Sequence, residues 1–178
     1  ESVDLALENS LEISGSISMP FGSPWEGEIG LDEVEAIVEA YLSLGIDEIS
    51  LSDASGMAVP NQVYSICKSM REKYPKVKWW LHFHNTRGLA IANILAAMQS
   101  GITNFDSSLA GLGGCPFVPG AAGNVSTEDV IHMLDEMGLE SGIDLKKIIV
   151  IGKEIQDVVE GGTDSYILKA GRSRDLVR

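Results

Sequence analysis

Residues 77–84, Val-Lys-Trp-Trp-Leu-His-Phe-His, have the apolar and aromatic composition of a buried β-strand. Side chains alternate between the two faces of a strand, so His82 and His84 are expected on the same face. Two imidazoles on the same face at the end of a strand can bind one metal ion together. The stretch therefore predicts a strand, Val77–His84, that ends in a pair of candidate metal ligands.

The same pattern repeats on both sides of this strand: an apolar run, a turn rich in Gly, Ser and Asp, and an amphipathic helix. The other predicted strands are Leu11–Met19, Asp47–Leu51 and Asn104–Ala110. The predicted helices are Leu31–Leu44, Asn61–Lys73, Leu89–Ser100, Thr127–Met137 and Asp144–Val159, with Leu5–Ser10 as the end of an earlier helix.

Strands that alternate with helices indicate parallel βαβ units, which build either an open doubly wound sheet or a (βα)8 barrel. Asp53, His82, His84 and the segment around Cys115 each follow or end a strand, which favours the barrel, because barrel enzymes keep their chemistry at the carboxyl ends of the strands. A complete barrel needs about 250 residues, and the chain has 178. We therefore predict an α/β fold: a partial TIM barrel in a single domain, residues 1–178.

Composition excludes several functions. The chain is 44% hydrophobic, as globular proteins are, and its net charge is −13. Nucleic acids and anionic membranes attract clustered positive charge, and the one basic concentration, residues 169–178, is expected to be a solvated terminus. We therefore expect neither a nucleic-acid partner nor a membrane partner.

Cysteine usage and the ends of the chain suggest its compartment. Cys67 and Cys115 lie in such different surroundings that we expect no disulfide between them, which favours a reducing compartment. No stretch is apolar enough to span a bilayer or to act as a secretion signal. The expected location is the cytoplasm, or the mitochondrial matrix in a eukaryote. Because the first residue is Glu1, the chain is expected to be processed, trimmed or partial.

Four motifs, in this order and spacing, resemble those of a known enzyme family: Ser-Leu-Ser-Asp-Ala-Ser-Gly at 50–56, His-Phe-His-Asn-Thr-Arg-Gly at 82–88, Phe-Asp-Ser-Ser-Leu-Ala-Gly-Leu-Gly-Gly-Cys-Pro at 105–116, and Pro-Gly-Ala-Ala-Gly-Asn-Val-Ser-Thr-Glu-Asp at 119–129. The stretch Ile13–Leu145 resembles the lyase branch of the family that holds 3-hydroxy-3-methylglutaryl-coenzyme A (HMG-CoA) lyase, isopropylmalate synthase and homocitrate synthase. These proteins are (βα)8 barrels that use a divalent metal. The resemblance implies strands four to eight of such a barrel and Mg²⁺ or Mn²⁺ as cofactor.

The resemblance also implies roles for individual residues. His82, His84 and Asn124 would be metal ligands, and Cys115 a catalytic thiol. His82 would also lie near the proton to be removed, with Asp53 as a further carboxylate of the catalytic site and Glu128 in a supporting position.

Each of these residues also has a purely structural interpretation that the sequence leaves open. A lone inward histidine is commonly a satisfied core residue, and Asn124 could cap the helix predicted from Thr127. Cys115 could be a packing thiol, Asp53 an Asx-turn residue, and Glu128 a carboxylate that complements a helix dipole.

The function implied by the resemblance is metal-dependent cleavage of an HMG-CoA-type thioester to acetyl-CoA and a keto acid, acetoacetate. An acyl-CoA substrate and a homo-oligomer are expected. A condensing synthase of the isopropylmalate or homocitrate type is the alternative within the family, although the Gly-Gly-Cys-Pro motif favours a lyase. From another class, the chain could be a catalytically incomplete barrel that oligomerises or binds metal.

Two departures from the family pattern bear on substrate and metal. Asn85 stands where the lyase pattern usually has Asp, and Arg87 is a further difference, so the acyl group is left open. The family also carries an Asp metal ligand and an Arg-Asp pair on its first strands, and nothing before Ile13 can supply them.

Overall fold

The computed structural model describes residues 2–114, 116, 118, 120–160 and 163–176. Within these residues, parallel strands form a four-stranded sheet in chain order. The strands are β1 (Gly15–Ser18), β2 (Glu48–Asp53), β3 (Lys78–Phe83) and β4 (Phe105–Asp106), and the helices between them are α2 (Leu31–Ser43), α3 (Pro60–Lys73) and α4 (Ala90–Ser100). The predicted parallel α/β architecture is confirmed.

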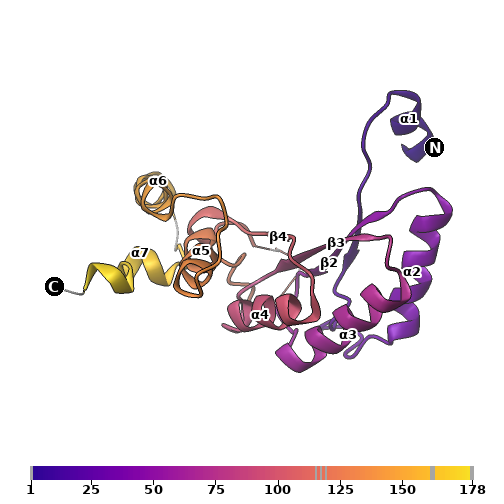
Figure 1. Cartoon of the computed structure of the whole chain (residues 1–178), viewed down its shortest axis with the longest axis horizontal. Helices are drawn as coiled ribbons and strands as arrows, with labels where there is room; N and C mark the ends of the chain where they lie inside the picture. The colour runs from indigo at the N-terminus through magenta and orange to yellow at the C-terminus, as the bar shows by residue number, and fades with distance from the viewer. Residues whose placement is uncertain (1, 115, 117, 119, 161–162, 177–178) are drawn as a thin grey trace.

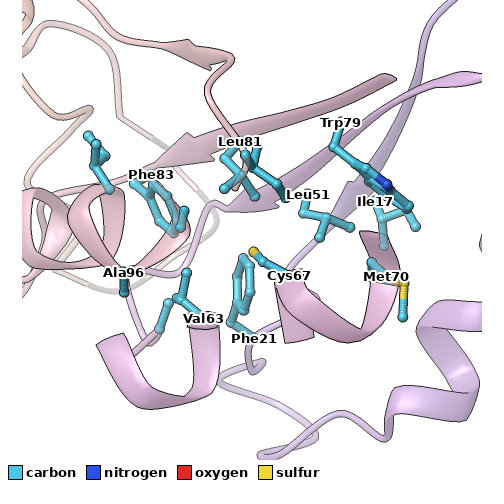
Figure 2. Close-up of a cluster of buried hydrophobic side chains, with 14 of the residues drawn as sticks. Ile17, Phe21, Leu51, Val63, Cys67, Met70, Trp79, Leu81, Phe83 and Ala96 are labelled. Carbon is cyan, nitrogen blue, oxygen red and sulfur yellow. The ribbon is translucent and has the colours of Figure 1, made fainter. Parts of the chain in front are cut away.

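Helices α2, α3 and α4 lie along one side of the sheet (Figure 1). Alternate residues of β2 and β3 are buried toward them, including Leu51, Leu81 and Phe83. Figure 2 shows these side chains packed against Val63 and Cys67 of α3. Burial of this apolar face provides the main favourable contribution to folding of the layered sheet.

The opposite face of the sheet is more exposed and carries mostly polar side chains, with Trp80, beside Ser50, as an aromatic exception. The register places Ser16 beside Ser50, and Ser18 beside Ser52. Ser16 and Ser18 are exposed, and Ser50 and Ser52 are half-buried. We call these four residues the serine face. In a closed barrel this face would line the interior.

The chain continues beyond β4 with a group of helices at one end of the sheet: α5 (Thr127–Glu136), α6 (Leu145–Val158) and α7 (Tyr166–Ala170) (Figure 1). Short 3₁₀ turns occupy Leu109–Gly111 and Ser173–Asp175. At the other end, α1 (Ser2–Glu8) projects away from the sheet on an extended segment. Within the described residues, no helix has both the length and the apolar character needed to cross a bilayer.

Several predicted boundaries were wrong. Predicted strand Leu11–Met19 shortens to β1, and predicted strand Asn104–Ala110 shortens to two residues, because Ser108 pairs with Ser126 in an isolated bridge and the chain then turns. Helix α7 was not predicted. It depends on a distant carboxylate: Asp129 of α5 accepts hydrogen bonds from the backbone N–H groups of Tyr166 and Ile167, at 3.1 and 2.9 Å.

Cys67 of α3 is a core residue, with an exposed fraction of 0%. Burial raises its pKa to about 12. Because the thiolate is the reactive form, we expect a Cys115→Ser variant to react with a thiol reagent at least about a hundredfold more slowly when native than in denaturant. Stopped-flow labelling with and without urea measures this ratio, and equal rates would contradict the packing of α3 described here.

Candidate active site

His82 and His84 lie together at the carboxyl end of β3, with their ring centroids 5.1 Å apart. The strand register places His82 opposite Asp106 of β4, and His82 Nδ1 is hydrogen-bonded to the Asp106 carboxylate. A carboxylate on one ring nitrogen fixes the orientation of an imidazole and leaves the other nitrogen for a ligand. His82 Nε2 is therefore the atom available for chemistry.

Asn124 is joined to His84 through the backbone, because the two residues form an isolated antiparallel bridge. The Asn124 side-chain amide donates from Nδ2 to the carbonyl of Leu112 at 2.7 Å, and its backbone N–H donates to the carbonyl of Gly113 at 2.9 Å. These bonds fix the orientation of the amide, and no described residue donates a hydrogen bond to its oxygen Oδ1. The structure thus brings all three predicted metal ligands to one end of the sheet.

Two buried polar atoms at this place lack hydrogen-bond partners among the described residues: His84 Nδ1 and Asn124 Oδ1. A buried polar atom without a partner costs about 1–3 kcal/mol, and a bound ion is one of the explanations for such an atom. Burial, followed by the neighbouring His82, lowers the pKa of His84. The ring therefore favours its neutral form, which is the form that binds a cation.

The donor atoms fit a divalent cation, since imidazole nitrogen and amide oxygen are common ligands of such ions. Among the residues that the structure describes, the set is incomplete, because no three His, Cys, Asp or Glu side chains form a cluster that could hold a metal.

The position of Asn124 depends on the glycine before it. Gly123 has φ +116°, and a Cβ there would lie 2.6 Å from the carbonyl oxygen of Gly111 and 3.0 Å from that of Gly113. Both neighbours are backbone atoms, which cannot turn away as a side chain can. Only glycine fits this close approach, which holds Asn124 against the end of β3.

The two carboxylates singled out from the sequence are buried and face backbone. Asp53 accepts hydrogen bonds from the backbone N–H groups of Met57 at 3.0 Å and Ala58 at 3.1 Å and from the Ser55 hydroxyl at 3.1 Å. Burial raises the pKa of Asp53, and the hydrogen bonds partly oppose that rise. Glu128 accepts from the backbone N–H of Ala110 at 3.0 Å. Both carboxylates order the loops that follow strands.

Two interactions of this region were not predicted from the sequence. Asp106 has no role in the sequence analysis, because its pairing with His82 depends on the β3–β4 register. Arg87 had no assigned role, and its Nη1 donates to the backbone carbonyls of Ser55 and Gly56 on the preceding loop. Cys115, the predicted catalytic thiol, lies outside the described residues.

A parallel sheet with helices on one side and polar donors at the carboxyl ends of its strands is the arrangement of (βα)8-barrel enzymes. A family model described as HMGL-like matches residues 6–155. The chain belongs to this family.

Two curated relatives are similar to the chain over most of its length. The chain is 39% identical over 163 residues to the (R)-citramalyl-CoA lyase of Chloroflexus aurantiacus, which covers 92% of this chain and 51% of that protein. It is 40% identical over 152 residues to a hydroxymethylglutaryl-CoA lyase of Bacillus subtilis, covering 85% of this chain and 51% of the relative. The chain therefore spans about half the length of the curated relatives it matches.

The fold is shared with a solved structure of an HMG-CoA lyase from Acinetobacter baumannii in complex with coenzyme A and 3-methylmalate. The TM-score is 0.92 at 42% identity, and the match covers 99% of this chain and 57% of that one. The four-stranded sheet is thus part of a TIM barrel.

Proposed function

We propose that the protein containing this chain is a metal-dependent carbon–carbon lyase that cleaves an HMG-CoA-type thioester to acetyl-CoA and a keto acid, acetoacetate. The observation that carries the proposal is the meeting of His82, His84 and Asn124, where His84 Nδ1 and Asn124 Oδ1 have no hydrogen-bond partner among the described residues. Relatives named as lyases of HMG-CoA and citramalyl-CoA support the same reaction class.

His82, His84 and Asn124 would hold the divalent cation, which supplies a Lewis acid that makes the substrate hydroxyl more acidic. The hydroxyl proton passes to the exposed Asp106 carboxylate, which is held beside the site by its hydrogen bond to His82 Nδ1. The carbinol oxygen becomes a carbonyl as the adjacent carbon–carbon bond breaks, and that electron pair remains on the thioester fragment as an enolate. By resemblance, the Cys115 thiol donates the proton that converts the enolate to acetyl-CoA.

An assay of the full-length protein with HMG-CoA tests the proposal. We expect acetyl-CoA and acetoacetate in equal amounts, loss of activity with a chelator, and recovery with Mg²⁺ or Mn²⁺. A Cys115→Ala variant should lose roughly 10²–10⁴-fold in kcat, the contribution typical of a general acid. A Cys67→Ala variant, which removes the core thiol, serves as the control for loss of fold.

The outcomes of this assay separate the alternatives. Faster cleavage of citramalyl-CoA than of HMG-CoA would reassign the acyl group and keep the reaction class. Condensation of acetyl-CoA with a keto acid as the favoured reaction would identify a synthase. Unchanged turnover in Cys115→Ala would remove the thiol from the mechanism.

A second candidate is a barrel portion that does no chemistry by itself. It is favoured by the incomplete ligand set among the described residues and by the exposed serine face. Such a portion would pair with itself or be completed by another chain. Size-exclusion chromatography of this chain, combined with the thioester assay, decides the matter: an active monomer excludes this candidate.

A further inference from the structure

Arg87 lies in the turn between β3 and α4, three residues after His84, and is fixed to the neighbouring loop. Its Nη1 donates to the backbone carbonyl of Ser55 at 3.0 Å and to that of Gly56 at 3.3 Å. Gly56, with φ +63°, packs so closely on Thr86 that an added Cβ would lie 2.7 Å from the Thr86 Cβ. The turn and the loop after β2 therefore form one surface at the carboxyl ends of the strands.

The Arg87 side chain keeps donors for a ligand. Its two carbonyl partners occupy Nη1, and Nε and Nη2 have no hydrogen-bond partner among the residues that the structure describes. A planar guanidinium with two parallel N–H groups is suited to a carboxylate. Arg87 is exposed and makes no ion pair within the part of the chain that the structure describes. By contrast, Lys73 and Lys78 pair with glutamates at 2.8 and 2.5 Å. An immobilised cation without an acidic partner, in a chain of net charge −13, points to an anionic ligand.

The position of Arg87 limits which anion it can reach. The backbone N–H of His84 donates to the carbonyl of Asp53 at 3.2 Å, so the turn and the loop after β2 are joined beside the candidate ligands. Three residues of chain span at most about 11 Å, so the Cα atom of Arg87 lies within about that distance of the Cα atom of His84, near the place where the acyl group of the substrate would meet the cation. The phosphates of coenzyme A are separated from the thioester by the long pantetheine arm. The free carboxylate of the acyl group is the nearer anion.

This inference rests on the proposed function. We propose that Arg87 is a specificity-determining residue that binds the free carboxylate of the acyl-CoA substrate through the guanidinium donors left by its contacts with Ser55 and Gly56. Both the hydroxymethylglutaryl and the citramalyl group carry such a carboxylate. The residue selects thioesters of hydroxylated dicarboxylic acids over those of monocarboxylic acids.

Calorimetric titration of the full-length protein tests the assignment without relying on activity. The probes are 3-methylmalate in the presence of coenzyme A, and coenzyme A alone. We expect Arg87→Gln to weaken 3-methylmalate binding roughly 10- to 100-fold, the range for hydrogen bonds to charged groups, and to leave coenzyme A binding unchanged within about twofold. Arg87→Lys should be intermediate, because an ammonium keeps the charge and loses the fork of donors. Lys76→Gln removes an equal charge at the opposite end of β3 and should change neither affinity.

Three results for Arg87→Gln would overturn the assignment. The first is an unchanged affinity for 3-methylmalate. The second is a loss of affinity for coenzyme A alone, which would assign Arg87 to a phosphate, and the third is an equal loss of affinity for both ligands, which would indicate a rearranged loop. Absence of dicarboxylate binding by the unmodified protein would overturn it as well. A protein that binds 3-methylmalate through Arg87 yet fails to cleave either thioester would contradict the proposed function and leave the role of Arg87 intact.

Discussion

Replacing His84 with alanine is expected to weaken the binding of Mn²⁺ to the full-length protein by more than about 100-fold. Loss of a residue that only supports a ligand typically costs 10–100-fold in metal affinity, and His84 is proposed to be a ligand itself. The physical basis is the buried Nδ1, which has no hydrogen-bond partner in the described part of the chain, on a ring whose lowered pKa favours the neutral form. Electron paramagnetic resonance of free Mn²⁺ during a titration measures the affinity directly.

His132→Ala is the matched control for this experiment. His132 lies on α5, where its Nε2 is 3.1 Å from the Ser173 hydroxyl, and it has no place in the proposed site. Its replacement should leave Mn²⁺ affinity within about twofold of the unmodified protein, in line with the small effects of changes away from a site. Equal losses in both variants, or none in His84→Ala, would contradict the proposed metal site.

Replacing Phe83 with alanine is expected to lower the free energy of unfolding by about 3–5 kcal/mol, the range for truncating a buried phenylalanine. Phe83 is 1% exposed and stacks on Phe21, with ring centroids 5.8 Å apart. It also lies between the two site histidines in sequence, and its carbonyl accepts a hydrogen bond from the backbone N–H of Val125 at 3.0 Å. Urea denaturation followed by circular dichroism measures the loss.

Tyr64→Ala on α3 controls for removal of an aromatic ring. Tyr64 is 37% exposed, and the Lys68 ammonium lies 6.0 Å from the centroid of its ring. We expect its loss to cost less than about 1 kcal/mol, because an exposed cation–π contact is weak. A cost below about 1 kcal/mol for Phe83→Ala too would show that the face between sheet and helices is not the stabilising core.

The sequence predicted the parallel architecture and the face shared by His82 and His84, because both follow from local periodicity. The alternation of apolar residues specifies which face of a strand is buried, and it needs no knowledge of neighbouring strands. The family motifs added Asn124, for which spacing alone offered only a capping role.

What could not be predicted depends on contacts between distant parts of the chain. The pairing of His82 with Asp106 requires the register of β3 and β4, which neither strand encodes alone. Arg87 donates to backbone carbonyls. Because every residue has a backbone carbonyl, the sequence does not show which of them a side chain will contact. Helix α7 begins where Asp129, 37 residues earlier, accepts from Tyr166, so its N-terminus is likewise set by tertiary structure.

The serine face has a consequence for assembly of the complete barrel. Small hydroxyl side chains form hydrogen bonds with water, which aliphatic side chains cannot do. Burial of the serine face therefore contributes little hydrophobic free energy. The attraction between this half and the strands that close the ring must then come from backbone pairing along the outer edges of β1 and β4 and from contacts between peripheral helices. Closure of the ring would pack these small polar side chains, together with Trp80, into the layers of side chains that fill a barrel interior, directly beneath the two imidazoles.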